Sequence, residues 1–218
     1  RDNSKIIGTG GYALYNSYDN LVLNAGEING IYNANKLTLT DDVYVNSTVS
    51  SAACVHSTDA SSQVIMNGGR CDAANIGISM QGTGETFTMN GGKITANSHA
   101  IYVKNFDGAN TTTITDGELE TANTHTIYIY GLGHNLTIDD AKVTSKNYTA
   151  IYMEYWSSYD QYRYNVTING GTFKGADYGA VFHYTNLDIN GGTFETTSTN
   201  RDRYAIWKYY GNNATIKS

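Results

Sequence analysis

An eight-residue motif recurs along the chain and limits its possible folds more than any other feature. The motif reads "VTINGGTF" at 166–173 and "LDINGGTF" at 187–194. Looser copies begin at residues 21, 37, 64, 87, 112 and 136, and a truncated copy begins at 214. The copies lie about 24 residues apart on average, a period that is typical of solenoids in which each repeat forms one coil.

A second block follows most copies of the motif and reads, for example, "AIYV" at 100–103 and "TIYIY" at 126–130. Both blocks alternate apolar and polar residues with period two, which indicates strands rather than helices. Leucine-rich repeats need a leucine-asparagine framework that is missing, and propeller blades need longer units. We therefore predict an all-β fold, a single right-handed parallel β-helix of about eight to nine coils that occupies residues 1–218.

The strand pattern assigns each residue of the motif to one side of the coil. Ile168 and Phe173 are expected to point inward, and Thr167 and Thr172 to face outward. The Asn-Gly-Gly between them turns a corner, because glycine and asparagine tolerate positive φ. Asparagines at the same place in several copies are expected to stack as a hydrogen-bonded ladder: Asn24, Asn67, Asn90, Asn169 and Asn190.

Composition excludes several classes of protein. The net charge of −6 argues against a nucleic-acid partner, and no apolar run is long enough for a membrane-spanning segment. Cys54 and Cys71 form either a disulfide or two small core residues, and the sequence leaves both open. Because the chain starts at Arg1 without a methionine, we expect it to be a fragment of a longer multidomain protein.

Three aspartates replace corner glycines on neighbouring coils. Asp116 comes from one coil, and Asp139 and Asp140 come from the next. Stacked strands would bring them close together, and carboxylate oxygens are ligands for Ca²⁺. The alternative is that aspartate is another good turn residue. These three residues are the only metal-site candidates, and we expect no other cofactor and no catalytic residue.

Aromatic residues gather in the second block and in an insertion, "YWSSYDQYRY" at 155–164. One outward column is expected to contain Tyr128, Tyr152, Phe182 and Trp207, and a second column lies two residues further along each strand. Such a surface is unusual for an inert sheet and fits sugar rings or a protein partner, although stacked tyrosines also stabilise sheets. The candidate ligand-binding residues are Tyr128, Tyr130, Tyr152, Tyr155, Trp156, Tyr159, Tyr162, Tyr184, Trp207 and Tyr209.

The coils "TINGGTF…GAVF" and "TMNGGKI…HAIYV" resemble repetitive cell-surface proteins of Gram-positive gut bacteria that contain pectate-lyase-like β-helix domains. The resemblance implies a secreted, cell-surface, non-catalytic adhesin that binds a polysaccharide, a glycan or a host surface protein. It also leaves two alternatives. One is a polysaccharide lyase or glycoside hydrolase, for which no arginine aligns with the aspartates. The other is a structural stalk or self-assembling filament subunit.

Overall fold

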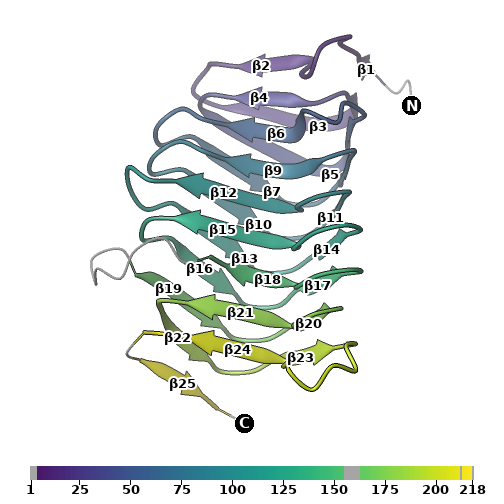
Figure 1. Ribbon diagram of the computed structural model, residues 1–218. Helices are drawn as coiled ribbons and strands as arrows, with labels where there is room; N and C mark the ends of the chain where they lie inside the picture. Colours follow the sequence, from purple (N-terminus) through teal and green to yellow (C-terminus); the bar gives the residue numbers. More distant parts are fainter. Residues whose placement is uncertain (1–3, 155–162, 212, 218) are drawn as a thin grey trace.

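The chain folds into a β-solenoid of about eight turns, whose successive turns are about 24 residues apart. The computed structural model describes residues 4–154, 163–211 and 213–217. No helix occurs in that part of the chain, so it contains none that is long and apolar enough to cross a membrane. In Figure 1 the front strands point left and the chain returns behind them as it descends, which is a right-handed coil. The predicted fold class is confirmed.

Each full coil contributes three strands, one to a nine-stranded sheet and two to a sixteen-stranded sheet. The nine-stranded sheet faces the viewer in Figure 1 and consists of β2 (Leu14–Asn16), β4 (Ile31–Asn33), β6 (Ala53–Ser57), β9 (Ile76–Met80), β12 (Ile101–Asn105), β15 (Ile127–Gly131), β18 (Ile151–Met153), β21 (Ala180–His183) and β24 (Ile206–Tyr209). We call it the front sheet. All its strand pairs are parallel, and each strand pairs with the equivalent strand of the next coil.

The larger sheet bends around the back and one side of the solenoid. Its back strands are β7 (Gln63–Met66), β10 (Thr86–Met89), β13 (Thr111–Ile114), β16 (Asn135–Ile138), β19 (Tyr164–Ile168), β22 (Thr185–Ile189) and β25 (Ala214–Ile216). Its side strands are β8 (Arg70–Ala73), β11 (Lys93–Ala96), β14 (Glu118–Thr121), β17 (Lys142–Ser145), β20 (Thr172–Gly175) and β23 (Thr193–Thr196). In the first coils β3 (Leu21–Ile28) and β5 (Lys36–Ser47) run through both regions, and β1 (Lys5–Ile6) pairs with β3.

The repeated motif forms the corner between a back strand and a side strand. Ile168 and Phe173 are fully buried, whereas Thr172 is exposed, as the alternation predicts. The second glycine of the corner adopts positive φ, with 102° at both Gly171 and Gly192. A side chain is strained in that conformation, which explains why glycine recurs there.

An asparagine ladder runs along this corner, but other residues interrupt it. Asn90 donates to Asn67 over 2.8 Å, and Asn190 donates to Asn169 over 2.9 Å. Between these pairs the ladder position is taken by Thr115, which donates to Asn90, and by Asp139, which accepts from Asn169. At Asn24 the strand register shifts, and its main-chain carbonyl oxygen accepts a hydrogen bond from Thr40. The predicted ladder is confirmed for four of its five asparagines.

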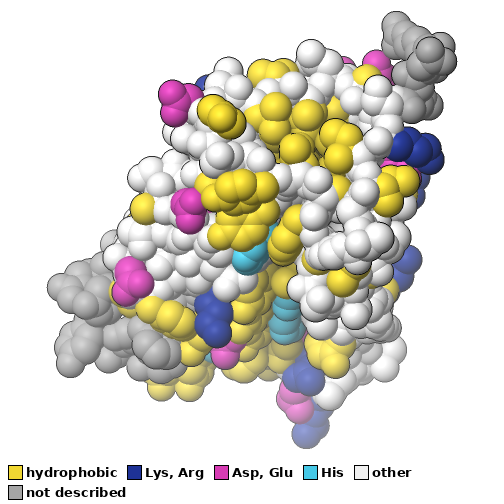
Figure 2. Space-filling view, turned by 90° about the horizontal axis from the view of Figure 1, so that it is seen from above, with side chains coloured by type: hydrophobic (Ala, Val, Ile, Leu, Met, Phe, Trp, Pro, Cys, Tyr) yellow, Lys and Arg dark blue, Asp and Glu magenta, His cyan; other side chains and the backbone are white. Residues whose placement is uncertain are grey.

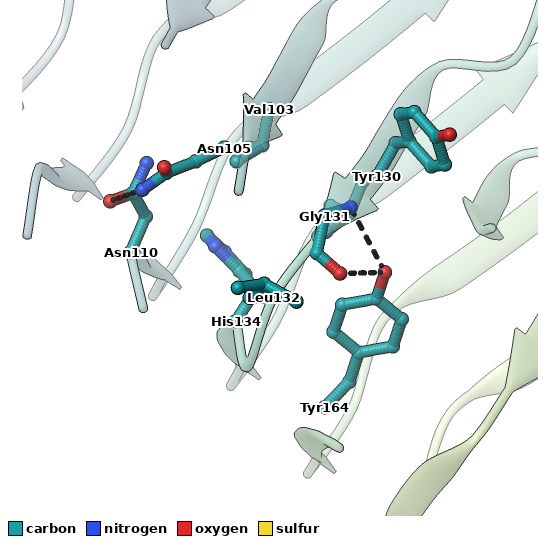
Figure 3. Close-up of a pocket in the computed structure, with 9 residues that line it drawn as sticks. Val103, Asn105, Asn110, Tyr130, Gly131, Leu132, His134 and Tyr164 are labelled. Carbon is teal, nitrogen blue, oxygen red and sulfur yellow. Dashed lines mark hydrogen bonds between the residues drawn. The ribbon is translucent and has the colours of Figure 1, made fainter. Parts of the chain in front are cut away.

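A cluster of buried polar groups lies in the turns that follow the front strands (Figure 3). Asn105 donates to the Gly82 carbonyl oxygen over 2.8 Å, and the Tyr164 hydroxyl lies 2.8 Å from the Glu154 carbonyl oxygen. The Tyr164 hydroxyl also accepts a hydrogen bond from the Gly131 amide over 3.2 Å. These bonds satisfy main-chain groups that would otherwise be buried without partners, so they fix the turns that carry the ends of the front strands.

Cys54 of β6 and Cys71 of β8 form a disulfide inside the coil. Both residues are fully buried, and the bond links the front sheet to the side strands. This finding decides between the two alternatives that the sequence leaves open.

The disulfide leads to a prediction about stability. Because the bond closes a loop of 17 residues, replacing both cysteines with alanine is expected to lower the free energy of unfolding by roughly 2 to 3 kcal/mol. Urea unfolding with and without reductant measures this effect. Reductant should destabilise the wild type and leave the Cys54→Ala/Cys71→Ala variant unchanged. Two alkylatable thiols in the unreduced, unfolded wild type would contradict the bond.

Candidate functional site: an aromatic strip on the front sheet

The outer face of the front sheet carries a continuous row of rings, which we call the aromatic strip. Parallel pairing places Tyr102 opposite Tyr128, and Tyr128 opposite Tyr152, on consecutive coils. Because the strands are in register, side chains of the same column lie about 4.8 Å apart along the axis. The strip consists of His99, Tyr102, His125, Tyr128, Tyr152, His183, Trp207 and Tyr209.

The tyrosines in the middle of the strip stack face to face. The ring centroids of Tyr102 and Tyr128 are 5.6 Å apart with planes at 10°, and those of Tyr128 and Tyr152 are 6.1 Å apart with planes at 6°. All three rings are half-buried. Each ring therefore covers the face of its neighbour, and this part of the strip offers ring edges and hydroxyl groups rather than ring faces to a ligand.

Histidines complete the stack. The His99 ring lies 4.9 Å from Tyr128, and the His125 ring lies 4.3 Å from Tyr152 with planes at 15°. Hydrogen bonds hold both rings: His99 Nδ1 lies 2.7 Å from the His125 carbonyl oxygen, and His125 Nδ1 accepts from the Thr149 amide over 3.3 Å. Figure 2 shows histidine side chains between hydrophobic side chains in one strip. The site predicted from the sequence does not include His99 or His125, although each residue directly precedes the second block of its coil.

Burial keeps the strip uncharged near neutral pH. It lowers the pKa of His125 to about 4, with a smaller contribution from His99, and it also lowers the pKa of His99 and of His183. Burial, followed by a hydrogen bond to the Glu154 carboxylate, raises the pKa of Tyr128. The strip can therefore offer neutral rings, phenol hydroxyls and imidazoles to a ligand.

The stack changes direction beyond Tyr152. Val181 lies opposite both Tyr152 and Trp207, so the column has no tyrosine on this coil. His183 lies 5.9 Å from Tyr152 with planes at 59°, and 6.1 Å from Trp207 with planes at 56°. Rings that are tilted in this way no longer cover each other's faces.

The prediction that Phe182 faces outward is wrong. Phe182 is fully buried opposite Met153, and His183, rather than Tyr184, is opposite Tyr209. In the structure Ala180, rather than Val181, lies opposite Ile151. This pairing differs by one residue from the predicted alignment, so each following side chain lies on the other face of the sheet. The physical reason is core volume, because the large Phe182 side chain fills the core where the small Ala180 does not. Strand pairing also places His56 in the column next to Tyr32.

Exposed rings gather at the last front strand. Trp207 is 36% exposed, Tyr209 42% and Tyr210 59%. Tyr210 contacts Tyr209 at 4.2 Å and stacks on Tyr184 at 5.4 Å, so the predicted residue Tyr184 joins this group from the end of β21. The sequence-based site did not include Tyr210, and its only signal was the Tyr-Tyr pair after Lys208. We call Trp207, Tyr209, Tyr210 and the half-buried Tyr184 beside them the exposed ring group.

The remaining candidate residues fall into two sets. Tyr130 is half-buried and lies opposite Lys104 in the second column, with its ring 5.1 Å from that of Phe106. The candidates of the insertion lie outside the described residues: Tyr155, Trp156, Tyr159 and Tyr162.

The three aspartates proposed as a calcium site lie at the exposed corner. Asp139 accepts a hydrogen bond from Asn169 over 2.7 Å as part of the ladder, and Asp116 accepts from the Gly117 amide. Among the residues that the structure describes, no three His, Cys, Asp or Glu side chains are placed to hold a metal ion together. The calcium site stays a prediction, and we build no chemistry on it.

Comparisons with protein-family models, with curated proteins and with solved structures gave no match for this chain. A functional assignment for this chain therefore depends on the geometry of the aromatic strip.

Proposed function

We propose that this chain is a non-catalytic, extracellular β-helix domain that binds a polysaccharide or glycan through the exposed ring group and the adjoining aromatic strip. The observation that carries the proposal is the change from parallel to tilted rings after Tyr152, together with the exposure of Trp207, Tyr209 and Tyr210 at the last front strand. Flat apolar faces next to hydroxyl and imidazole groups suit sugar rings, which present C–H groups on one side and hydroxyls around the edge.

Two features support the other parts of the proposal. A buried disulfide favours an oxidising compartment such as the cell exterior. The strip is neutral near pH 7, which fits recognition without proton transfer. The sequence resemblance to bacterial surface adhesins points in the same direction, and a surface protein of the host is the second ligand class we consider.

Binding to immobilised polysaccharides and a glycan array tests the proposal. Trp207→Ala and Tyr209→Ala are expected to weaken binding at least about tenfold, because large rings at the centre of a contact surface dominate affinity. Tyr15→Ala is the matched control, since Tyr15 is an exposed front-sheet tyrosine at the opposite end of the solenoid. Equal binding by all three variants would contradict the proposal, and release of reducing ends would favour the lyase or hydrolase alternative instead.

A further inference from the structure

Two shallow hollows meet at Arg70, on the side of the solenoid formed by β5, β8 and β11. The first has a volume of about 450 Å³ and lies at the Asn-Gly-Gly corner between Asp41 and Arg70. The second, of about 550 Å³, extends along β8 to the next corner. Four of the residues that line it are alanines: Ala73 and Ala96, whose side chains point into the core, and Ala74 and Ala122, which follow β8 and β14. Hollows of this size are large enough to hold a small ligand.

Arg70 is held in place between the hollows. Its guanidinium group forms an ion pair of 2.6 Å with Asp72 Oδ2 and lies 5.7 Å from the centre of the Tyr44 ring. The Tyr44 hydroxyl donates to the same Asp72 oxygen over 3.0 Å. The three side chains therefore form one fixed unit, so a ligand would meet oriented donors without having to order them.

Two polar atoms in the wall of the second hollow have no partner. Asp72 on β8 and Thr95 on β11 are opposite each other in the sheet. Among the described residues, neither Asp72 Oδ1 nor Thr95 Oγ1 has a hydrogen-bond partner, and both are buried. Buried polar atoms are normally paired. A carboxylate oxygen only accepts, and a threonine hydroxyl both donates and accepts. A ligand hydroxyl group that displaces the side chains covering these atoms could therefore pair with both.

Ion pairs connect β11 to the next coils of the same side. Glu118 on β14 accepts from Lys93 over 3.0 Å and from Lys142 over 2.8 Å, so long charged side chains bond to each other across these strands. The two hollows therefore lie beside a row of ion pairs on the same side of the solenoid.

We infer that this groove, from Asp41 to Asn97, binds a neutral, hydroxyl-rich sugar unit. The charged residues that line the two hollows are Asp41, Asp42, Asp72 and Arg70. Lys93, opposite Arg70, forms ion pairs with Glu118 and Glu120, so the acidic lining disfavours an acidic sugar. The planar polar groups of Asn46 and Asn97 line the second hollow and supply further donors and acceptors for ring hydroxyls. The groove lies on the side strands and is separate from the aromatic strip on the front sheet.

Amide chemical shifts in an isotope-labelled protein test the inference. The probes are neutral oligosaccharides of glucose and of xylose, with oligogalacturonate as the acidic counterpart. We expect the neutral probes to shift the signals of Asn46, Asp72 and Asn97 saturably, and Arg70→Met to weaken that binding about tenfold. Lys174→Met is the matched control, because Lys174 also lies on a side strand in an ion pair, with Glu195.

The variant Trp207→Ala separates the two surfaces: it is expected to leave the Asn46 and Asn97 shifts unchanged even if the exposed ring group binds nothing. The inference is overturned if no neutral probe shifts these signals, if oligogalacturonate binds more tightly than the neutral probes, or if Arg70→Met binds like Lys174→Met. If Arg70→Met does not fold, Asn46→Ala replaces it, and it is likewise expected to weaken binding of the neutral probes.

Discussion

Gly131→Ala is expected to destabilise the solenoid by about 4 kcal/mol or more, at the upper end of single-residue effects. Gly131 ends β15 with φ of 135°, and a Cβ atom built there would lie 1.7 Å from the Asn105 carbonyl oxygen of the previous coil. That oxygen cannot move away freely, because it accepts a hydrogen bond from the Leu132 amide over 2.9 Å. Figure 3 shows Gly131 joined to Tyr164 by hydrogen bonds on its other side.

Urea unfolding followed by the far-ultraviolet β-sheet signal measures this effect. Gly10→Ala is the matched control, because nothing lies within 4 Å of the added Cβ at Gly10, and a change below about 0.5 kcal/mol is expected there. The aromatic strip should be disturbed as well, since β15 carries Tyr128. If both variants unfolded at the same urea concentration as the wild type, the result would contradict the close contact between Gly131 and the Asn105 carbonyl oxygen of the previous coil.

Glu85→Gln is expected to stabilise the protein increasingly as the pH rises from about 4.5 to 7. The Glu85 side chain is almost fully buried; it accepts from Ser62 over 3.0 Å and from the Gly82 amide over 2.8 Å. Burial raises its pKa from 4.5 to about 7. The folded state thus holds the Glu85 proton more tightly than the unfolded state does. The stability that this protonation contributes is fully present below about pH 4.5 and is lost as the pH rises through 7.

The size of the effect follows from the two pKa values. The difference between 4.5 and about 7, at ~1.36 kcal/mol per pH unit, corresponds to about 3 kcal/mol lost in the wild type above pH 7. Glutamine can still accept from Gly82 and can donate to Ser62, so the variant avoids the ionisation without losing the contacts.

Unfolding free energies of both proteins from pH 4 to 8 check this prediction. The difference between variant and wild type is the informative quantity, because the histidines titrate in both. Burial lowers the pKa of His134 to about 3, so its effect has the opposite sign and appears as the pH falls below 6.5. A constant difference across the pH range would mean that Glu85 is not buried in the folded protein.

The sequence predicts the coil but not every register. Alternation and the Asn-Gly-Gly corner are local signals, so Ile168 and Phe173 could be placed inside from the residues alone. "GAVFHY" could not be placed in this way, because aligning Ala180 with Ala150 looks as good as the true register. The volume of Phe182 in the core decides between them, and that depends on neighbouring coils.

The sequence predicts the tyrosine column of the candidate site, but not the contacts that depend on turns and on distances across a coil. The tyrosine column follows from the repeat, since Tyr102, Tyr128 and Tyr152 occupy the same place in each block. The stacking of His125 on Tyr152 depends on the conformation of the turn before the strand, which no period reveals. The disulfide depends on the separation of Cys54 and Cys71 across one coil, 6.2 Å between Cα atoms, and sequence spacing does not give that distance.

The fluorescence of Trp207 tests the central proposal most directly. In a Trp156→Phe background Trp207 is the only tryptophan, so its emission reports on the exposed ring group alone. A polysaccharide that the protein retains in pull-down is titrated into this variant. The proposal predicts a saturable change in emission whose half-point matches the binding curve, and a loss of that change in the Tyr209→Ala variant. Unchanged emission at saturating polysaccharide would contradict it and place the ligand elsewhere on the solenoid.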